Sequence, residues 1–293
     1  MKPLDIFLAL IVVVIWGFNF VVIQVGLRGL PPLLFSALRF LFAALPLVFF
    51  VKRPPVAWKL LAGYALFQFT IQFTLLFSGI KLGLPPGLAS LVIQLQAFFT
   101  IGLAVLLLSE KPLATQLFGA LIAFAGMGLV AMQLEARATV IGFVMVVGAG
   151  FSWAIANILT KQIGKVNALA LVTWGSLLAA PPLFLGSLWV EGPAAWIQAG
   201  VHLSWLTVGA VLFQSYPNTL FGFGLWSILL RRYPTATIVP FTLLVPVSGM
   251  LSAALVLGEP LQWWKITAGV LVLFGLALNQ FGARLLAPHA LTE

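Results

Sequence analysis

The sequence predicts an all-α integral membrane protein, with ten transmembrane helices as two inverted five-helix repeats. First, 62% of the 293 residues are hydrophobic and only 7% are charged. Second, the apolar residues form ten runs long enough to span a bilayer as helices. Third, landmark residues of the first half recur in the same order in the second half. Such a chain would aggregate in water, so the lipid bilayer is its expected partner.

The expected spans leave only short connections, in which no separate catalytic or regulatory domain can fold. The first span has a single basic residue ahead of it, and we expect it to be retained rather than cleaved as a signal peptide. The spans cover residues 4–27, 33–51, 58–80, 86–108, 113–132, 140–162, 168–190, 204–230, 235–257 and 261–282.

Three landmarks indicate the internal repeat. Glu110 after the fourth span recurs as Glu259 after the ninth, at an offset of 149 residues. The dipeptide Phe-Gln at 67–68 recurs at 213–214, an offset of 146, and Trp16 recurs as Trp153, an offset of 137. Each repeat holds five spans, an odd number, so the second repeat enters the membrane from the opposite side. The repeats are predicted at residues 1–134 and 139–293.

The basic residues set the expected orientation. The formal net charge is +9, but these residues are dispersed among loops rather than gathered on one face, so nucleic acid is not an expected partner. Ten of the 15 lysines and arginines fall on one side when the spans alternate. The positive-inside rule then places both termini in the cytoplasm.

Polar residues within the spans predict the location of a binding cavity. Tyr64, Gln68 and Gln72 follow one another at intervals of four on the third span, and Gln214 and Asn218 do so on the eighth. Polar groups are costly against hydrocarbon and usually face the interior of the helix bundle. The offset of 146 relates the two amide pairs, so both halves are predicted to present amides to one cavity. Alternatively, these amides only join helices to one another.

The first and sixth spans add an aromatic partner to an amide. Trp16 precedes Asn19 by three residues, and Trp153 precedes Asn157 by four. Amides donate and accept hydrogen bonds, and aromatic faces cover apolar groups or contact an ammonium group, so the set suits a polar or zwitterionic small molecule. On the fourth span, Gln94 and Gln96 lie on different faces, and Gln94 is the predicted cavity residue.

Arg39 lies within the second span, where a charge is costly unless it is compensated. The favoured interpretation is an arginine that snorkels to the surface or is paired locally. The alternative is a ligand for a substrate carboxylate.

These segments resemble a known family. Trp16 to Phe20, Ala37 to Phe40, Gly87 to Leu91 and the Glu and Pro-Leu that follow the fourth and ninth spans are similar to EamA-type ten-helix exporters of the drug/metabolite transporter superfamily. The resemblance covers nearly the whole chain. It is strongest to the bacterial branch that exports O-acetylserine and cysteine, and a related branch exports aromatic amino acids. The resemblance implies a multi-pass protein of the bacterial inner membrane that moves small molecules.

Prolines mark expected hinges. Pro85 and Pro86 precede the fourth span, Pro217 lies in the eighth, and Pro240 and Pro246 lie in the ninth. We interpret them as gating positions of a carrier, because broken helices are typical of moving transporter segments. A passive channel is the competing interpretation.

The side chains that are missing limit the chemistry. The chain has no cysteine, and its two histidines, His202 and His289, lie near a loop or a tail. All six acids are expected at helix ends, loops or termini: Asp5, Glu110, Glu135, Glu191, Glu259 and Glu293. This disfavours a membrane enzyme, a metal site and proton-coupled antiport of lipophilic cations, and no cofactor is expected.

The sequence therefore predicts an exporter of small metabolites that works by alternating access. Amino acids or their derivatives are the favoured substrates, of either the cysteine and O-acetylserine type or the aromatic type. A drug or nucleobase efflux carrier is the alternative to an amino acid carrier. Facilitated efflux is the simpler expectation, and proton coupling through Glu110 or Glu259 is the alternative. One chain holds both repeats, so a monomer is expected to suffice.

Overall fold

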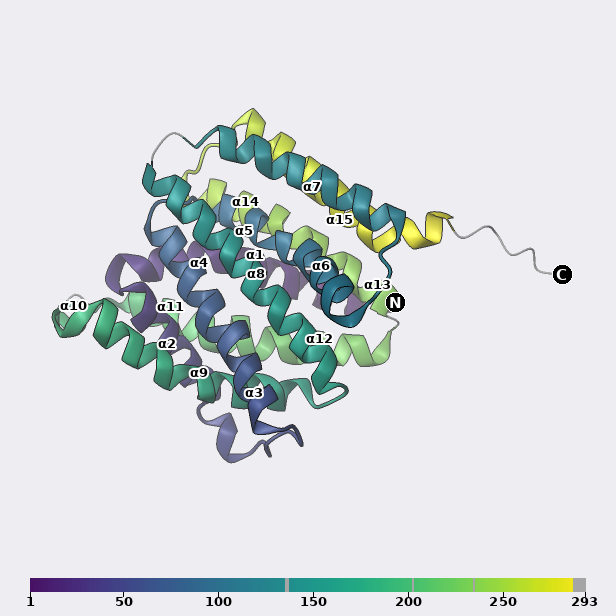
Figure 1. Cartoon of the computed structure of the whole chain (residues 1–293). Coiled ribbons are helices and arrows are strands. Elements are labelled where there is room, and N and C mark those ends of the chain that lie inside the picture. Colours follow the sequence, from purple (N-terminus) through teal and green to yellow (C-terminus); the bar gives the residue numbers. More distant parts are fainter. Residues whose placement is uncertain (135–136, 202, 234, 287–293) are drawn as a thin grey trace.

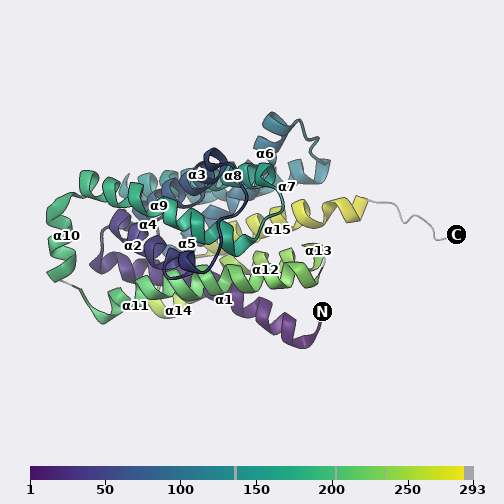
Figure 2. The same cartoon turned by 90° about the horizontal axis from the view of Figure 1, so that it is seen from below.

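The computed structural model describes residues 1–134, 137–201, 203–233 and 235–286. Glu135, His202, His289 and Glu293, which were considered above, lie outside these residues. Everything described folds into helices and short connections (Figures 1 and 2). Helix α1 begins and α15 ends on the same side of the bundle, which we call the terminal side (Figure 1). The other side is called the opposite side.

The first half contains five spans, three of which are interrupted. Helix α1 is continuous, whereas the second span ends in a short 3-10 helix and the third and fourth spans are broken in their interiors. The elements are α1 (Pro3–Gly29), α2 (Pro32–Ala44), η1 (Leu47–Phe49), α3 (Trp58–Ala65), η2 (Leu66–Ile71), α4 (Gln72–Lys81), α5 (Pro86–Val92), η3 (Ile93–Leu95), α6 (Gln96–Leu108) and α7 (Ala114–Met132).

The second half repeats this plan and adds one helix. Its third and fourth spans are broken at places that correspond to the breaks in the first half. The elements are α8 (Arg137–Ile163), α9 (Ala168–Val190), α10 (Gly192–Val201), α11 (Trp205–Phe213), η4 (Gln214–Phe221), α12 (Gly222–Arg232), α13 (Thr235–Ile238), η5 (Val239–Leu243), α14 (Leu244–Leu257) and α15 (Trp263–Leu286). Helix α10 was not expected, because the sequence there reads as a connection.

The helices are long and apolar enough for a membrane protein. Among the described residues, nine could cross a bilayer, and a tenth counts when Gly192–Val201 and Trp205–Arg232, which lie at 111°, are taken as one span. Helix starts follow local chemistry. Proline occupies the first turn of α1, α2 and α5, where its missing N–H costs nothing. The Asn167 side chain accepts hydrogen bonds from the first backbone N–H groups of α9.

Helix packing follows the inverted repeat. The fifth spans of the two halves, α7 and α15, lie side by side along one edge of the bundle (Figures 1 and 2), and the second spans, α2 and α9, also pack together. Helix α1 packs against α14, and its counterpart α8 packs against α6. Each half therefore supplies its first span to the fourth span of the other, as expected for two repeats related by a two-fold axis in the membrane plane.

Glycine allows α7 and α15 to approach closely. A Cβ placed on Gly119 would lie 2.5 Å from the carbonyl oxygen of Gly275, and one on Gly126 would lie 3.1 Å from that of Ala268. Small residues at such a contact let two backbones pack together, which is a common way to join helices in membranes.

The four described acids lie at helix ends, as predicted. Asp5, in the first turn of α1, accepts hydrogen bonds from Tyr233 (2.6 Å) and Arg232 (3.1 Å). Glu191, just after α9, accepts hydrogen bonds from the backbone N–H groups of Leu33 (2.6 Å) and Leu34 (3.1 Å) at the start of α2. A carboxylate is favourable there because helix N-termini carry partial positive charge. Glu110 and Glu259 follow α6 and α14.

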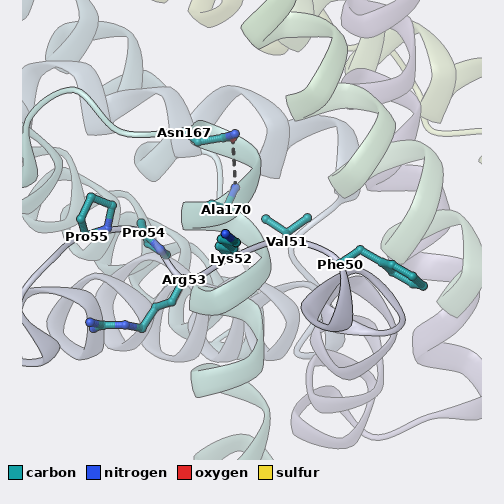
Figure 3. A pocket seen from close by; sticks show the side chains of 8 residues that line it. All are labelled: Phe50, Val51, Lys52, Arg53, Pro54, Pro55, Asn167 and Ala170. Carbon is teal, nitrogen blue, oxygen red and sulfur yellow. Dashed lines mark hydrogen bonds between the residues drawn. The ribbon is translucent and has the colours of Figure 1, made fainter.

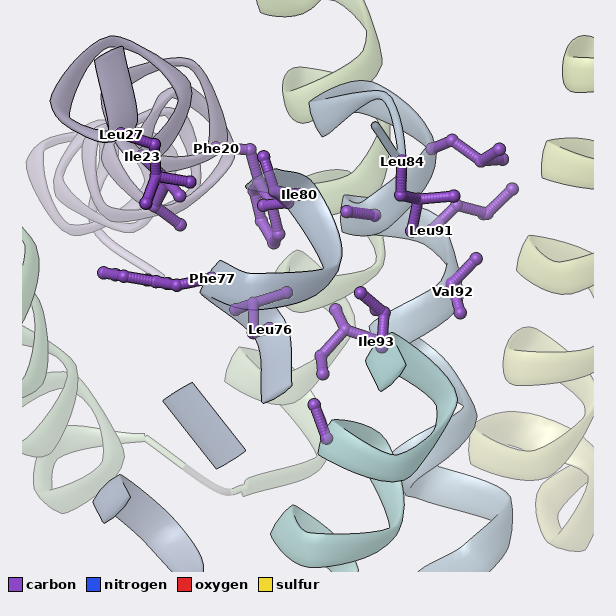
Figure 4. Close-up of a cluster of buried hydrophobic side chains, with 14 of the residues drawn as sticks. Phe20, Ile23, Leu27, Leu76, Phe77, Ile80, Leu84, Leu91, Val92 and Ile93 are labelled. Carbon is purple, nitrogen blue, oxygen red and sulfur yellow. The ribbon is translucent and has the colours of Figure 1, made fainter. Parts of the chain in front are cut away.

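An apolar core fills the bundle toward the opposite side. It includes Ile23 and Leu27 on α1, Phe77 and Ile80 on α4, and Leu91 on α5 (Figure 4), all of which are nearly or fully buried. These side chains converge from three helices and exclude water from this end of the bundle. The opposite side is therefore closed between α1, α4 and α5.

Candidate functional site

Both third spans are broken by a π-helical segment at equivalent places. Segment η2 covers Leu66–Ile71 and η4 covers Gln214–Phe221. Gln68 lies in η2 and Gln72 directly follows it, whereas Gln214 and Asn218 both lie in η4. All four side chains are buried. Single π turns inside helices occur frequently at functional sites, and here the two coincide with the two predicted amide pairs.

Segment η4 lies against the first and second spans of the other half. The Gln214 amide nitrogen donates to the backbone oxygen of Asn19 at 3.4 Å, and the Ser215 hydroxyl donates to the backbone oxygen of Arg39 at 3.0 Å. The indole N–H of Trp16 donates to the backbone oxygen of Asn218 at 3.2 Å. Trp16, Asn19, Arg39, Gln214 and Asn218 therefore form one cluster, which we call the η4 cluster.

Arg39 is the charged member of the η4 cluster. Its side chain is only 2% exposed, so the snorkelling interpretation is wrong. Its Nη2 donates to the Thr219 hydroxyl at 3.2 Å. The guanidinium also lies over the rings of Phe73 (4.1 Å to the centroid) and Phe40 (5.0 Å). Cation–π contacts offset part of the cost of burying the charge, and the single hydroxyl offers no counter-charge.

Several polar atoms of the η4 cluster have no hydrogen-bond partner. Among the described residues these include Nε and Nη1 of Arg39, and the side-chain oxygens of Asn19, Gln214 and Asn218. Buried polar atoms are normally paired, and each unpaired one is costly. The cluster combines unpaired cationic donors with unpaired amide acceptors. Arginine N–H groups are suited to a carboxylate, and amide oxygens are suited to an ammonium group.

The amide pair of the first half has its own surroundings. Gln68 donates to Gln72 at 3.1 Å within the same span. No hydrogen bond between described residues joins this pair to Gln214 or Asn218. Phe73, which follows Gln72, nevertheless contacts the Arg39 guanidinium, so Arg39 lies between the third span and η4. Tyr64 packs edge-on against Phe69, in an apolar cluster that also contains Phe40 and Phe73, the two rings beside the Arg39 guanidinium.

The fourth and sixth spans carry a second polar group. Asn157 on α8 donates to the Gln96 side chain at 2.8 Å and to the Thr100 hydroxyl at 3.0 Å. Gln96, rather than the predicted Gln94, is therefore the fourth-span glutamine that joins a candidate residue. Gln94 is half-buried. Trp153, one turn before Asn157, packs against the main apolar core.

The predicted gating prolines fall into two groups. Pro217 lies inside η4 and Pro240 inside the 3-10 helix η5, so both occupy broken parts of their spans. Pro85 and Pro86 instead begin α5, and Pro246 lies in the first turn of α14, where its backbone oxygen accepts a hydrogen bond from Ser90 at 3.4 Å. These three mark helix starts.

The inverted repeat is chemically asymmetric at Arg39. The offset of 137 residues that relates Trp16 to Trp153 takes Arg39 on α2 to Ser176 on α9, which is buried and uncharged. Sequence reasoning missed Ser215 and Thr219, although they follow Gln214 and Asn218 by one residue and repeat their spacing. It also missed Phe73, whose role depends on a contact between two spans.

Two pockets open near the terminal side. One of about 400 Å³ lies between the loop after α2 and the start of α9; Figure 3 shows Phe50, Arg53 and Asn167 among its lining residues. The other, of about 150 Å³, lies between α6 and α8 and is lined by Thr100, Glu110 and Lys161 among others. Both pockets are lined by residues at or near the ends of their helices.

Comparisons with known proteins agree with this architecture. A protein of known crystal structure aligns with 99% of this chain and 100% of its own length, with a TM-score of 0.67 and 18% identity, which shows the same fold. A probable amino-acid metabolite efflux pump of Salmonella typhimurium is 43% identical over 97% of both chains. Its counterpart in Escherichia coli is 42% identical over the same shares.

The match to a family profile occurs twice along the chain. The profile of the EamA-like transporter family matches residues 4–132 and again residues 140–281. These two stretches hold the helices that the inverted packing relates to one another. The chain is thus a multi-pass membrane protein, and it belongs to the EamA-like transporter family.

Proposed function

We propose that this protein exports amino acids or closely related metabolites across the bacterial inner membrane. In this proposal the substrate binds at the η4 cluster, and the two repeats rock around it in alternating access. The two relatives at 42–43% identity are probable amino-acid metabolite efflux pumps, which supports export of amino-acid metabolites. Both termini would lie in the cytoplasm, because most lysines and arginines fall on the terminal side.

One observation carries the choice of substrate class. Arg39 keeps unpaired N–H groups in the same buried cluster as the unpaired side-chain oxygens of Gln214 and Asn218. The arginine suits a carboxylate, and the amide oxygens suit an ammonium group. These two groups are common to every α-amino acid. The other candidate residues would line the rest of the substrate pathway. They are Tyr64, Gln68, Gln72, Gln94, Trp153 and Asn157.

The side chain of the substrate would contact the neighbouring aromatic rings. Phe40 and Phe73 lie beside the Arg39 guanidinium, and Trp16 packs 5.6 Å from Phe223 and 5.2 Å from Trp226, centroid to centroid. Aromatic walls accept a thiol, an acetyl ester or an aromatic ring. Both the cysteine and O-acetylserine type and the aromatic type therefore remain candidates for measurement.

The test is transport by the purified protein in liposomes. Cysteine, O-acetylserine, tryptophan, phenylalanine and threonine would be compared in the parent and in Arg39→Gln. Saturable movement of one class that is lost in Arg39→Gln supports both the carrier and its site. Movement that rises linearly with concentration would instead indicate a passive channel. If no amino acid moves, the amino acid assignment fails, and nucleobases or drugs become the next candidates.

A further inference from the structure

The fourth spans of the two halves end in the same way. Ser109 after α6 and Gly258 after α14 both adopt left-handed backbone conformations, with φ of 55° and 70°. The next residue closes the turn in both cases: Glu110 N–H donates to the oxygen of Ala104 at 3.2 Å, and Glu259 N–H donates to that of Ala253 at 3.3 Å. All these pairs are related by the offset of 149. The fold therefore presents the two glutamates identically.

The two glutamates nevertheless have different partners. Glu259 is half-buried on the opposite side and accepts a hydrogen bond from the backbone N–H of Gly87, in the first turn of α5, at 3.4 Å. Glu110 is exposed on the terminal side, and both its oxygens bind Nζ of Lys161, at 2.9 and 3.1 Å. Identical backbone ends thus make a span-to-span contact on one side and a surface ion pair on the other.

The contact at Glu259 closes the opposite side. A Cβ on Gly87 would lie 3.1 Å from both the Ala253 Cβ and a Glu259 carboxylate oxygen, so the start of α5 rests directly on the end of α14. One turn further, the Ser90 hydroxyl lies within hydrogen-bond distance of two backbone oxygens, those of Gly87 (2.6 Å) and Pro246 (3.4 Å), between which its single proton is shared. A carboxylate is favourable against the first N–H groups of a helical span.

The same contact has a counterpart position on the terminal side. The offset of 149 relates Gly87 to position 236, near the start of the ninth span. It also relates Glu110 to Glu259. In the structure, α6 packs against α8, and Glu110 is held by Lys161 on that helix. The terminal side therefore has both parts of the same contact, a glutamate and the start of a span, but its glutamate, Glu110, binds Lys161 instead.

We propose that Glu259 and Glu110 are reciprocal positioning residues that determine which side of the transporter is closed. Glu259 holds the fourth span against the ninth and keeps the opposite side shut in the state seen here. In the other state Glu110 leaves Lys161 and binds the start of the ninth span, while Glu259 releases Gly87. This inference rests on the alternating access of the proposed function, but it is independent of the substrate.

The test uses the natural absence of cysteine, because single cysteines can be introduced without removing any. Ser90→Cys reports on the opposite side, where Ser90 is fully buried, and Val105→Cys reports on the terminal side, where Val105 lines the smaller pocket. Labelling by a membrane-impermeant maleimide is measured in intact cells and in inverted membrane vesicles. No substrate is needed, so failure of the amino acid assignment leaves this test unaffected.

Glu259→Ala should raise labelling at Ser90→Cys and lower it at Val105→Cys, because the population shifts to the other state. The expected change is on the order of fivefold, which corresponds to the loss of one helix cap. Glu259→Gln should keep the opposite side closed, with labelling like that of the parent in acid, because the amide oxygen still accepts the Gly87 N–H. Adding Glu110→Ala to Glu259→Ala should return both labelling rates toward the parent values.

Three results would overturn the proposal. One is unchanged labelling at Ser90→Cys in Glu259→Ala. Another is a rise at both probes, which indicates general loosening of the fold. The third is a double variant that labels at Ser90→Cys faster than Glu259→Ala alone.

Discussion

The guanidinium of Arg39 lies over the ring of Phe73, with 4.1 Å between Cζ and the ring centroid, in the interior of the helix bundle. The two residues come from neighbouring spans, and the other edge of the guanidinium donates to Thr219 in η4. A buried cation held by a ring and one hydroxyl retains unused donors. This arrangement leads to the first prediction.

Arg39→Gln should weaken the apparent affinity for an amino acid by about 10-fold to 100-fold, because a hydrogen bond to a charged group contributes about 1.5–3 kcal/mol. Ser176→Ala is the matched control, since it alters the corresponding position of the other half. The control should change the affinity less than about threefold. The concentration dependence of uptake into liposomes measures both. Equal effects of the two substitutions would contradict the role of Arg39.

Gln214→Leu should discriminate between substrates. In the parent, the amide oxygen is available to the ammonium group of an amino acid, so its loss should weaken amino acid binding by about 5-fold to 30-fold. A carboxylic acid with the same side chain but no ammonium group should bind the parent and the variant equally. Competition against a labelled amino acid measures both affinities. If the substitution weakens the binding of both compounds equally, Gln214 does not contact the ammonium group.

Gly119→Ala should destabilise the protein, because the new Cβ would meet the Gly275 carbonyl oxygen and force α7 away from α15. Overpacking of this kind costs about 1–3 kcal/mol. Gly128→Ala on the same helix has nothing within 4 Å of its Cβ and should leave the unfolding temperature unchanged or slightly raised. Thermal unfolding in detergent compares the two. Similar shifts for both would show that the contact with Gly275 is unimportant.

The closure at Glu259 should depend on pH. Burial raises the pKa of the Glu259 carboxyl, against the smaller lowering effects of the Gly87 N–H and of Lys265, the charged residue nearby. A group whose pKa is higher in one state binds its proton more tightly there, so acid should favour the state closed on the opposite side. Labelling at Ser90→Cys should therefore fall as the pH is lowered through the raised pKa of Glu259 toward the ordinary glutamate value of about 4.3.

Glu259→Gln is the control for this effect, because its amide does not titrate in that range. Labelling at Ser90→Cys in this variant should be flat with pH, apart from the intrinsic reactivity of the thiol. A parent and a variant with the same pH profile would assign the dependence to another group.

Sequence patterns predicted the spans and the repeat because long apolar runs and recurring landmarks are local properties. They did not predict the π-helical segment η2, since Leu66–Ile71 contains no proline that would indicate a break in the helix. The choice of Gln94 over Gln96 assumed an ideal α-helix. The 3-10 helix Ile93–Leu95, which contains Gln94 and ends just before Gln96, changes the rotation per residue, and Gln96 contacts Asn157.

The residues of the η4 cluster were singled out separately from the sequence, and the contacts between them were not predicted. The spacing of Gln214 and Asn218 showed a polar stripe, and the charge of Arg39 showed that it needed compensation. That Arg39 meets Thr219 and Phe73 depends on how three spans pack. Such packing is decided by contacts between residues far apart in the chain, which a single sequence does not show.

The position that corresponds to Arg39 in the second half is occupied by Ser176, so the two halves are not interchangeable. Two copies of the first half, assembled as an inverted dimer, would each bring a buried guanidinium to the middle of the membrane. Like charges repel strongly in such a medium, and neither would have a counter-ion. Joining two unequal halves leaves one cation and one neutral hydroxyl. In the proposed function, a substrate anion would then bind off the two-fold axis, beside the half that carries Arg39.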